Sequence, residues 1–228
     1  MKRRTLHILI ALVLAALWSL ALGVGHWRGE VALLDRAESP LTDLRLVARG
    51  ERRAPDQLTI VAIDDDTAAK HGGYPLPRAG LAALVDAIAR LEPRVVGVDL
   101  LLIDQGNDRV QGDTALAQAL GKRPTVIASA AVFPQATQLI EAGEPGPLAR
   151  LPRAEKFLLP LKTFADHAAV GVVNLTADKS GTPRGVPMLF RTRDRVELSF
   201  PLRVAALATG SEPVIQADSL TLAGRRIR

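Results

Sequence analysis

Cysteine is absent from this chain of 228 residues, and Phe, Trp and Tyr together make up only 4% of it. Without cysteine, no disulfide can hold the fold together, and no thiolate can bind a metal ion or attack a substrate. The scarcity of aromatic rings argues against a groove that stacks nucleotide bases, because such grooves combine clustered Lys and Arg with aromatic side chains. We therefore expect no disulfide scaffold, no thiol chemistry and no nucleic-acid partner.

Motifs that mark common enzymes are also absent. The sequence contains no Gly-x-Ser-x-Gly motif and no phosphate-binding P-loop. Only His71 and His167, of four histidines, lie well beyond the N-terminal apolar run, and their wide separation favours surface or packing roles over a metal site. The sequence by itself therefore offers no convincing catalytic set, and we expect no cofactor.

One long apolar run stands out. Residues Leu6 to Gly25 carry no charge and directly follow the basic cluster Lys2-Arg3-Arg4. Twenty helical residues at ~1.5 Å each span roughly 30 Å, the thickness of the hydrocarbon core of a bilayer. Because basic residues beside a span stay in the cytoplasm, the chain beyond the span should be exported. We predict a single-pass protein of the inner (cytoplasmic) membrane, with a cytoplasmic N-terminus and a main domain that is periplasmic or extracellular.

The same run could also be a cleaved signal peptide. Ala21-Leu22-Gly23 fits the small-x-small exit of such a peptide. The apolar core is longer than a signal needs, however, and Trp18 and Trp27 lie in its distal part, where tryptophans anchor a span at the membrane interface. The sequence favours a retained anchor and leaves cleavage as the alternative.

The rest of the chain is predicted to form an α/β domain. A continuous apolar run at 58–63 indicates a strand buried on both faces, and further strands are predicted at 94–102, 124–130 and 170–175. Helical patterns at 81–91 and 113–120 separate the first three, which predicts a largely parallel sheet with right-handed crossovers, flanked by helices. Antiparallel strands are expected at 186–192 and 195–198, and a helix at 201–209.

We divide the chain into three parts. Residues 1–27 are the cytoplasmic stub and transmembrane anchor, residues 28–54 a juxtamembrane linker helix, and residues 55–228 the exported domain. The linker is expected to be helical over 30–49, with a fresh helix start at Ser39-Pro40. The hairpin that begins at Ser219 is expected to lack its return strand, which favours a chain that is incomplete at its C-terminus.

Carboxylates gather where the first two predicted strands end. Asp64, Asp65 and Asp66 close the first strand, Asp99 lies in the second, and Asp104 follows it. One interpretation is a Mg²⁺ or Ca²⁺ site for phosphate chemistry, because the run resembles the start of the haloacid-dehalogenase motif D-x-D-x-[TV]. The match fails at its last position, Ala68. The favoured interpretation is that these carboxylates cap the next helix and pair with Arg78.

Several segments together resemble a known family. They are the strand Ile60–Asp64 with Thr67, the segment Gly73–Arg78, and the strand Val95–Leu101 with Asp113. Downstream, the sequence also contains Gly171–Asn174, Asp178, Gly181 and Arg184. This set is similar to the CHASE type-two family of extracellular sensor domains, which are attached to bacterial adenylate cyclases, histidine kinases, serine/threonine kinases and diguanylate cyclases. The chain departs from the family pattern at Lys179-Ser180, where an aspartate is expected before the glycine.

The resemblance implies a sensor that is not an enzyme. It implies a receptor whose domain receives an unknown small-molecule or peptide stimulus and is normally coupled to a cytoplasmic cyclase or kinase, with a homodimer expected by analogy. Ligands of parallel α/β sheets bind at the carboxyl ends of the strands. The predicted binding residues there are Asp64, Thr67, Pro77, Arg78, Asp99 and Asp104, with Asn174, Asp178 and Arg184 as a second group. The alternative function is a membrane-tethered, metal-dependent hydrolase that uses Asp64, Asp66 and Asp99.

Overall fold

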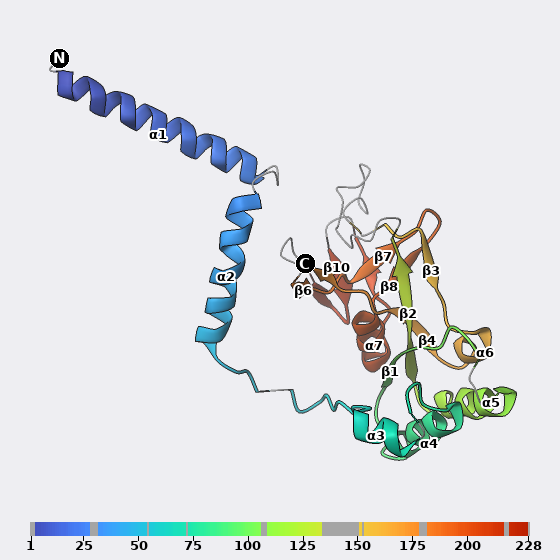
Figure 1. Ribbon diagram of the computed structural model, residues 1–228. Helices are drawn as coiled ribbons and strands as arrows, with labels where there is room; N and C mark the ends of the chain where they lie inside the picture. The colour runs from blue at the N-terminus through green and yellow to red at the C-terminus, as the bar shows by residue number, and fades with distance from the viewer. Residues whose placement is uncertain are drawn as a thin grey trace. The chain divides into compact units, whose positions relative to one another are not determined.

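The computed structural model describes residues 3–27, 32–53, 55–71, 73–105, 109–133, 151, 153–177, 182–216 and 219–227 (Figure 1). The chain divides into two compact units. The first consists mainly of the N-terminal part up to Thr59, and the second begins at Ile60.

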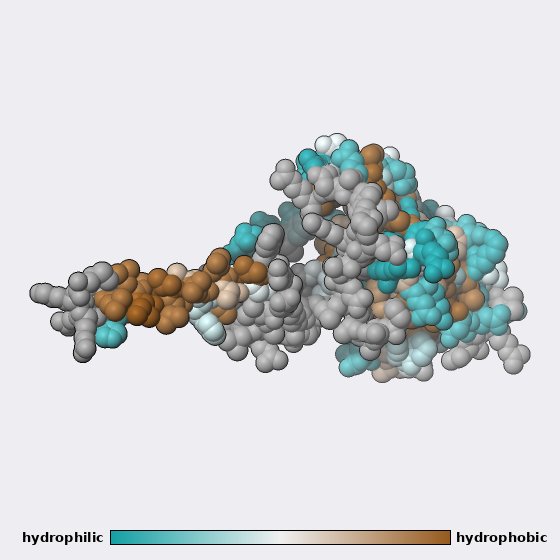
Figure 2. Space-filling view, turned by 90° about the horizontal axis from the view of Figure 1, so that it is seen from above, coloured by the Kyte–Doolittle hydropathy of each residue, from teal (hydrophilic) through white to brown (hydrophobic). Residues whose placement is uncertain are grey.

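The first unit contains two helices, α1 (Arg3–Trp27) and α2 (Ala32–Arg49). Within α1, Leu6–Gly25 is long and apolar enough to cross a membrane. Figure 2 shows hydrophobic residues along this helix. The helix expected over 30–49 is confirmed as α2, but the predicted fresh start at Ser39-Pro40 is wrong, because α2 continues through Pro40. The helix tolerates this proline although it provides no N–H for an intrahelical bond.

A small, largely parallel sheet forms the centre of the second unit. Strand β2 (Thr125–Val132) lies between β1 (Val96–Leu101) and β4 (Ala169–Val172), and both neighbours run parallel to it. A short strand, β3 (Lys156–Leu158), pairs with the end of β2 in the antiparallel direction. The predicted α/β class with a mixed, largely parallel sheet is confirmed, as are three of its predicted strands.

Helices cover both faces of this sheet. On one face, α4 (Arg78–Ala89), α5 (Arg109–Leu120) and α6 (Lys162–Ala165) enclose the main hydrophobic core, to which β1 contributes Val96 and Val98. Side chains alternate along a strand, so Gly97 of β1 belongs to the opposite face. There Gly97 lies against Phe200 and Val204 of α7 (Phe200–Thr209).

The packing of α7 brings two backbones together. A Cβ atom on Gly171 of β4 would lie 2.6 Å from the Cα of Phe200, so only glycine fits there. The predicted helix at 201–209 is confirmed, with Ser199 as its N-cap and Gly210 at its end in the left-handed conformation (φ 66°). The side chain of Ser199 accepts a hydrogen bond from the amide of Leu202 (3.4 Å), which satisfies one otherwise unpaired N–H at the helix start.

Short antiparallel strands complete the second unit. Strands β7 (Leu189–Arg191) and β8 (Val196–Leu198) form the expected hairpin. Strands β5 (Thr176–Ala177) and β6 (Pro183–Gly185) form another pair. Strand β10 (Leu220–Leu222) pairs with β9 (Val214–Ile215) and with β11 (Arg225–Ile227). The prediction that this last hairpin lacks its return strand is therefore wrong, because β11 is that strand.

Two further predictions differ from the structure. Residues 58–63 were predicted to form the first strand, but they carry no strand, and the short helix α3 (Asp65–Lys70) begins soon after them. An apolar, β-branched composition favours a strand, yet a strand exists only where a hydrogen-bonded neighbour is available. The helix predicted over 113–120 begins earlier, at Arg109, so Asp113 lies inside α5 and not at its start. Residues 134–150 lie outside the described residues.

Candidate functional site

The most connected side chain near the carboxyl end of β1 is that of Arg78, the first residue of α4. Its side chain is only 10% exposed, and its Nε lies 3.3 Å from Oδ1 of Asp113, which is also 10% exposed. Its Nη2 donates a hydrogen bond to the carbonyl oxygen of Asp104 (3.0 Å) and lies 3.5 Å from Oδ1 of the same residue. Its guanidinium carbon lies 5.7 Å from the centre of the Phe164 ring. We call Arg78, Asp104, Asp113 and Phe164 the arginine cluster.

The arginine cluster joins four parts of the fold. Arg78 starts α4, Asp113 lies in α5, Phe164 lies in α6, and Asp104 follows β1. A buried guanidinium is costly unless carboxylates, carbonyls or aromatic faces replace the water that it loses, and here all three kinds of partner are present. The cluster therefore fixes the positions of three helices against the end of β1.

Its two carboxylates have different environments. Asp113 is almost fully covered, whereas the side chain of Asp104 is 82% exposed. An exposed pair at 3.5 Å contributes little, while a buried pair is strongly destabilised when one partner is removed. Arg78 thus has one buried carboxylate partner, Asp113, and one exposed carboxylate partner, Asp104.

Asp64 and Thr67 are hydrogen-bonded to each other. Oδ1 of Asp64 accepts hydrogen bonds from the hydroxyl (2.6 Å) and the amide (2.8 Å) of Thr67, and this bonded pair caps α3. These two bonds hold the pKa of the Asp64 carboxyl below its ordinary value, because they stabilise the charged form. The expectation that this carboxylate caps the next helix is confirmed. Pro77 is exposed and occupies the N-cap position of α4.

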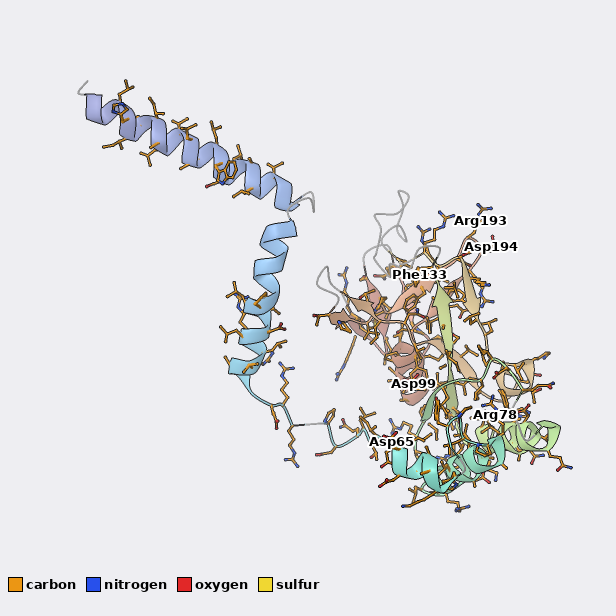
Figure 3. All side chains as sticks on the ribbon, in the orientation of Figure 1. Asp65, Arg78, Asp99, Phe133, Arg193 and Asp194 are labelled. Carbon is orange, nitrogen blue, oxygen red and sulfur yellow. The ribbon has the colours of Figure 1, made fainter. Side chains whose placement is uncertain are left out.

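Asp99 lies apart from both groups. It is exposed on β1 and alternates with Val98, so it belongs to the face opposite the main core. Figure 3 shows Asp65, Arg78 and Asp99 on three separate elements, α3, α4 and β1. Among the residues that the structure describes, no three His, Asp or Glu side chains are grouped so that they could hold a metal ion. The alternative of a hydrolase built on Asp64, Asp66 and Asp99 therefore gains no support from the geometry.

The second predicted group is only partly described. The side-chain oxygen of Asn174 accepts a hydrogen bond from the amide of Ala131 (2.6 Å), and its nitrogen donates one to the carbonyl of Ala131 (2.9 Å). Asn174 thus continues the pairing of β4 with β2 beyond the last strand residue, so its side chain is engaged within the fold. Arg184 is in β6, but its side chain lies outside the described part of the chain, as does Asp178 altogether.

Asp113 and Phe164 were missing from the predicted site. Asp113 precedes the buried residues Leu116, Ala117 and Leu120 of α5 by three, four and seven positions. This spacing puts all four side chains on one face of the helix. A carboxylate on an apolar helical stripe indicates a buried cationic partner, and that signal could have identified Asp113. No comparable local signal marks Phe164, because its contact with Arg78 joins residues distant in sequence.

A hollow of about 440 Å³ lies at the other end of the sheet, where β2 and β4 begin. Lys122, Arg123 and His167 are among its lining residues. Lys122 already pairs with Asp86 (2.9 Å), and Arg123 donates to the carbonyl of Pro93 (3.0 and 3.1 Å). Two of its three basic side chains thus already have partners within the chain.

Comparison with known proteins agrees with this architecture. The model of the CHASE2 domain family matches residues 9–227, nearly the whole chain. Comparison with curated protein sequences and with solved structures gave no significant match. The CHASE2 domain is a sensor domain and not a catalytic one, which agrees with the lack of a catalytic set in the sequence. The chain therefore belongs to the CHASE2 family and carries an extracytoplasmic sensory domain of the kind found in signalling receptors.

Proposed function

We propose that this domain detects an anionic small molecule or peptide through the arginine cluster and passes the signal to a cytoplasmic cyclase or kinase. The observation that carries the proposal is the unequal environment of the two carboxylates beside Arg78. A carboxylate of the stimulus would replace Asp104 at Nη2 of Arg78, while Asp113 keeps the inner side of the guanidinium paired. The charge-assisted N–H donors of arginine are well suited to bind a carboxylate.

Replacement of Asp104 would have consequences beyond the site. Asp104 belongs to the segment that follows β1, and Arg78 holds that segment against α4. A ligand that takes the place of Asp104 would therefore bind better when this segment is released from Arg78 than when Arg78 holds it. Such a difference in affinity is what shifts a protein between two conformations.

The direct test measures the affinity of a carboxylate panel for the full chain in detergent or lipid nanodiscs, through the rise in unfolding temperature with ligand concentration. Asp104→Asn removes the competing carboxylate and keeps the backbone contact, so it should tighten binding. The matched control is Asp99→Asn, which removes an exposed carboxylate from the opposite face of β1 and should leave the affinity unchanged. No stabilisation across the panel, or equal affinities in wild type and Asp104→Asn, would contradict the proposed site.

The proposed topology places the N-terminus in the cytoplasm, α1 in the inner membrane, residues 28–54 as a linker and residues 55–228 outside the cytoplasm. The basic residues before the span support this orientation. Since the chain lacks cysteine, single cysteines report it cleanly. Glu212→Cys, at a side chain that is 79% exposed, should react with an impermeant maleimide added to intact spheroplasts, and Thr5→Cys should not. The reverse pattern would overturn the orientation.

A further inference from the structure

Strand β1 has a free edge. It pairs with β2 on one side, and in the described part of the chain no strand pairs with its other side. An edge strand presents a row of backbone N–H and C=O groups that can accept another strand. Proteins normally cover such an edge or blunt it with charge, and here Asp99 is the one charged residue within β1.

The segment Ile60–Ile63 has the composition of a strand without being one. Its sequence, Ile-Val-Ala-Ile, is apolar and mostly β-branched, which favours strands. Ile60 is 83% exposed and Val61 is 60% exposed, although both belong to the compact second unit. Asp64, the next residue, already has extended backbone angles (φ −88°, ψ 176°). The apolar side chains of this segment are therefore exposed to water, and a position in the sheet would cover them.

Ile63 already holds one end of this segment against the main core. It packs against the main core cluster, which contains Val96, Val98 and Leu102. Because side chains alternate along a strand, Ile63 on the core face places Val61 on that face and Ile60 on the opposite one. Ile60 would then share the face of Asp99 and Leu101, and this parity determines which side chains can become neighbours.

The connection between the two segments suits parallel pairing. Residues 65–95 contain α3 and α4 and lead from Asp64 to the start of β1. A parallel pair needs a crossover of a dozen or more residues, usually with a helix, and this one has the required length and content. Since the connection is short and Ile63 is already in place, the segment is present at high effective concentration near the edge, unlike a strand from another molecule.

We propose that Ile60–Ile63 docks on the free edge of β1 as an additional parallel strand, so that the sheet has an undocked and a docked state. The docked strand would cover the apolar side chains of the segment and the open edge together. In the chain, residues 50–59 lie between α2 and this segment. The proposal does not depend on the ligand or on the arginine cluster.

Paired cysteines test the docking directly. Neighbouring strands lie about 4.7–4.9 Å apart, within the range of about 4.4–6.8 Å that a disulfide bridges between Cα atoms. In the full chain in nanodiscs, we expect Ile60→Cys with Asp99→Cys, or with Leu101→Cys if the register differs by two, to form an intrachain disulfide. The matched control, Val61→Cys with Asp99→Cys, puts the two sulfurs on opposite faces and should react at least about tenfold more slowly.

A second measurement does not require substitutions. Docking would protect the amides of residues 60–63 from hydrogen exchange, which is measured on the wild-type chain in the same nanodiscs. Similar crosslinking rates in the test and control pairs, together with exchange as fast as in an unstructured peptide, would overturn the proposal. A disulfide that joins two chains would overturn the assignment of the occupant, because the docked strand would then come from a second copy.

Discussion

The two faces of the central sheet are held by different means. On the face of α4 and α5, apolar side chains interlock around a buried ion pair between Arg78 and Asp113. On the face of α7, the backbone of the helix approaches the strand so closely that Gly171 has no room for a side chain. One face is joined by side chains and the other partly by backbone contact.

The difference shows where the fold tolerates adjustment. Side chains can change rotamers and exchange partners, whereas two backbones in contact can only separate. The outer carboxylate of the arginine cluster, Asp104, lies at the edge of the adjustable face. We therefore expect the conformational response proposed above on the side of α4 and α5 and not on the side of α7. Four experiments test this difference between the faces and the contacts behind it.

The largest effect is expected at the buried ion pair. Asp113→Ala leaves the guanidinium of Arg78 buried without its inner partner, and such losses destabilise proteins by about 3–5 kcal/mol. Asp104→Ala is the matched control, because its exposed carboxylate should contribute at most about 1 kcal/mol. Urea unfolding of both variants measures the difference. If the two substitutions cost the same, the distinction between an inner and an outer partner is wrong.

The next effect concerns the backbone contact of α7. Gly171→Ala places a methyl group against the backbone of Phe200, which cannot yield by a rotamer change, so we expect a loss of about 3 kcal/mol. Gly97→Ala meets the far end of the Phe200 ring at 3.1 Å, where the side chain can turn. That variant should lose about 1 kcal/mol. Equal unfolding free energies for Gly171→Ala and Gly97→Ala would show that the α7 face is as adjustable as the face of α4 and α5.

A smaller effect is expected at Asn174. Asn174→Ala removes both hydrogen bonds to Ala131 and leaves its partly buried peptide group without them, at a cost of about 1–3 kcal/mol. Asn174→Asp retains an acceptor for the amide but places a carboxylate beside the carbonyl, so it should not restore the wild-type stability. Thermal unfolding compares the three proteins. A wild-type melting temperature in Asn174→Ala would show that the side chain does not help to join β4 to β2.

The smallest effect is local and depends on pH. The pKa of Asp64 is lower in the folded chain than its ordinary value of 3.8, so its cap contributes fully above that pH. The contribution is lost as the pH falls through the lower folded value. Thr67→Val removes the hydroxyl donor, which is the main cause, and should raise the pKa of Asp64. An NMR titration of the Asp64 carboxyl carbon checks this, and an unchanged pKa in the variant would contradict the assigned cause.

The accuracy of the sequence predictions depends on the range of the interactions involved. The strands at 94–102, 124–130 and 170–175 and the helix at 81–91 were correctly predicted, because apolar runs and helical spacing are local signals. The strand at 58–63 was wrong, since composition indicates a preference but does not supply a neighbouring strand. Arg78 and Asp104 were predicted to belong to one site and do lie together, whereas Asp64, Thr67 and Asp99 lie elsewhere.

Local patterns in the amino-acid sequence were enough to identify the apolar segment Leu6–Gly25, the alternation of helices and strands, and, through combined motifs, the family. These properties depend on residues close together in the chain, whose spacing is visible without a structure. The pairing of Asp113 with Arg78, the bonds of Asn174 to Ala131, and the contact of Gly171 with Phe200 emerged only from the folded domain. Each of these contacts joins residues distant in sequence, and packing of the whole domain selects it among many chemically equivalent partners.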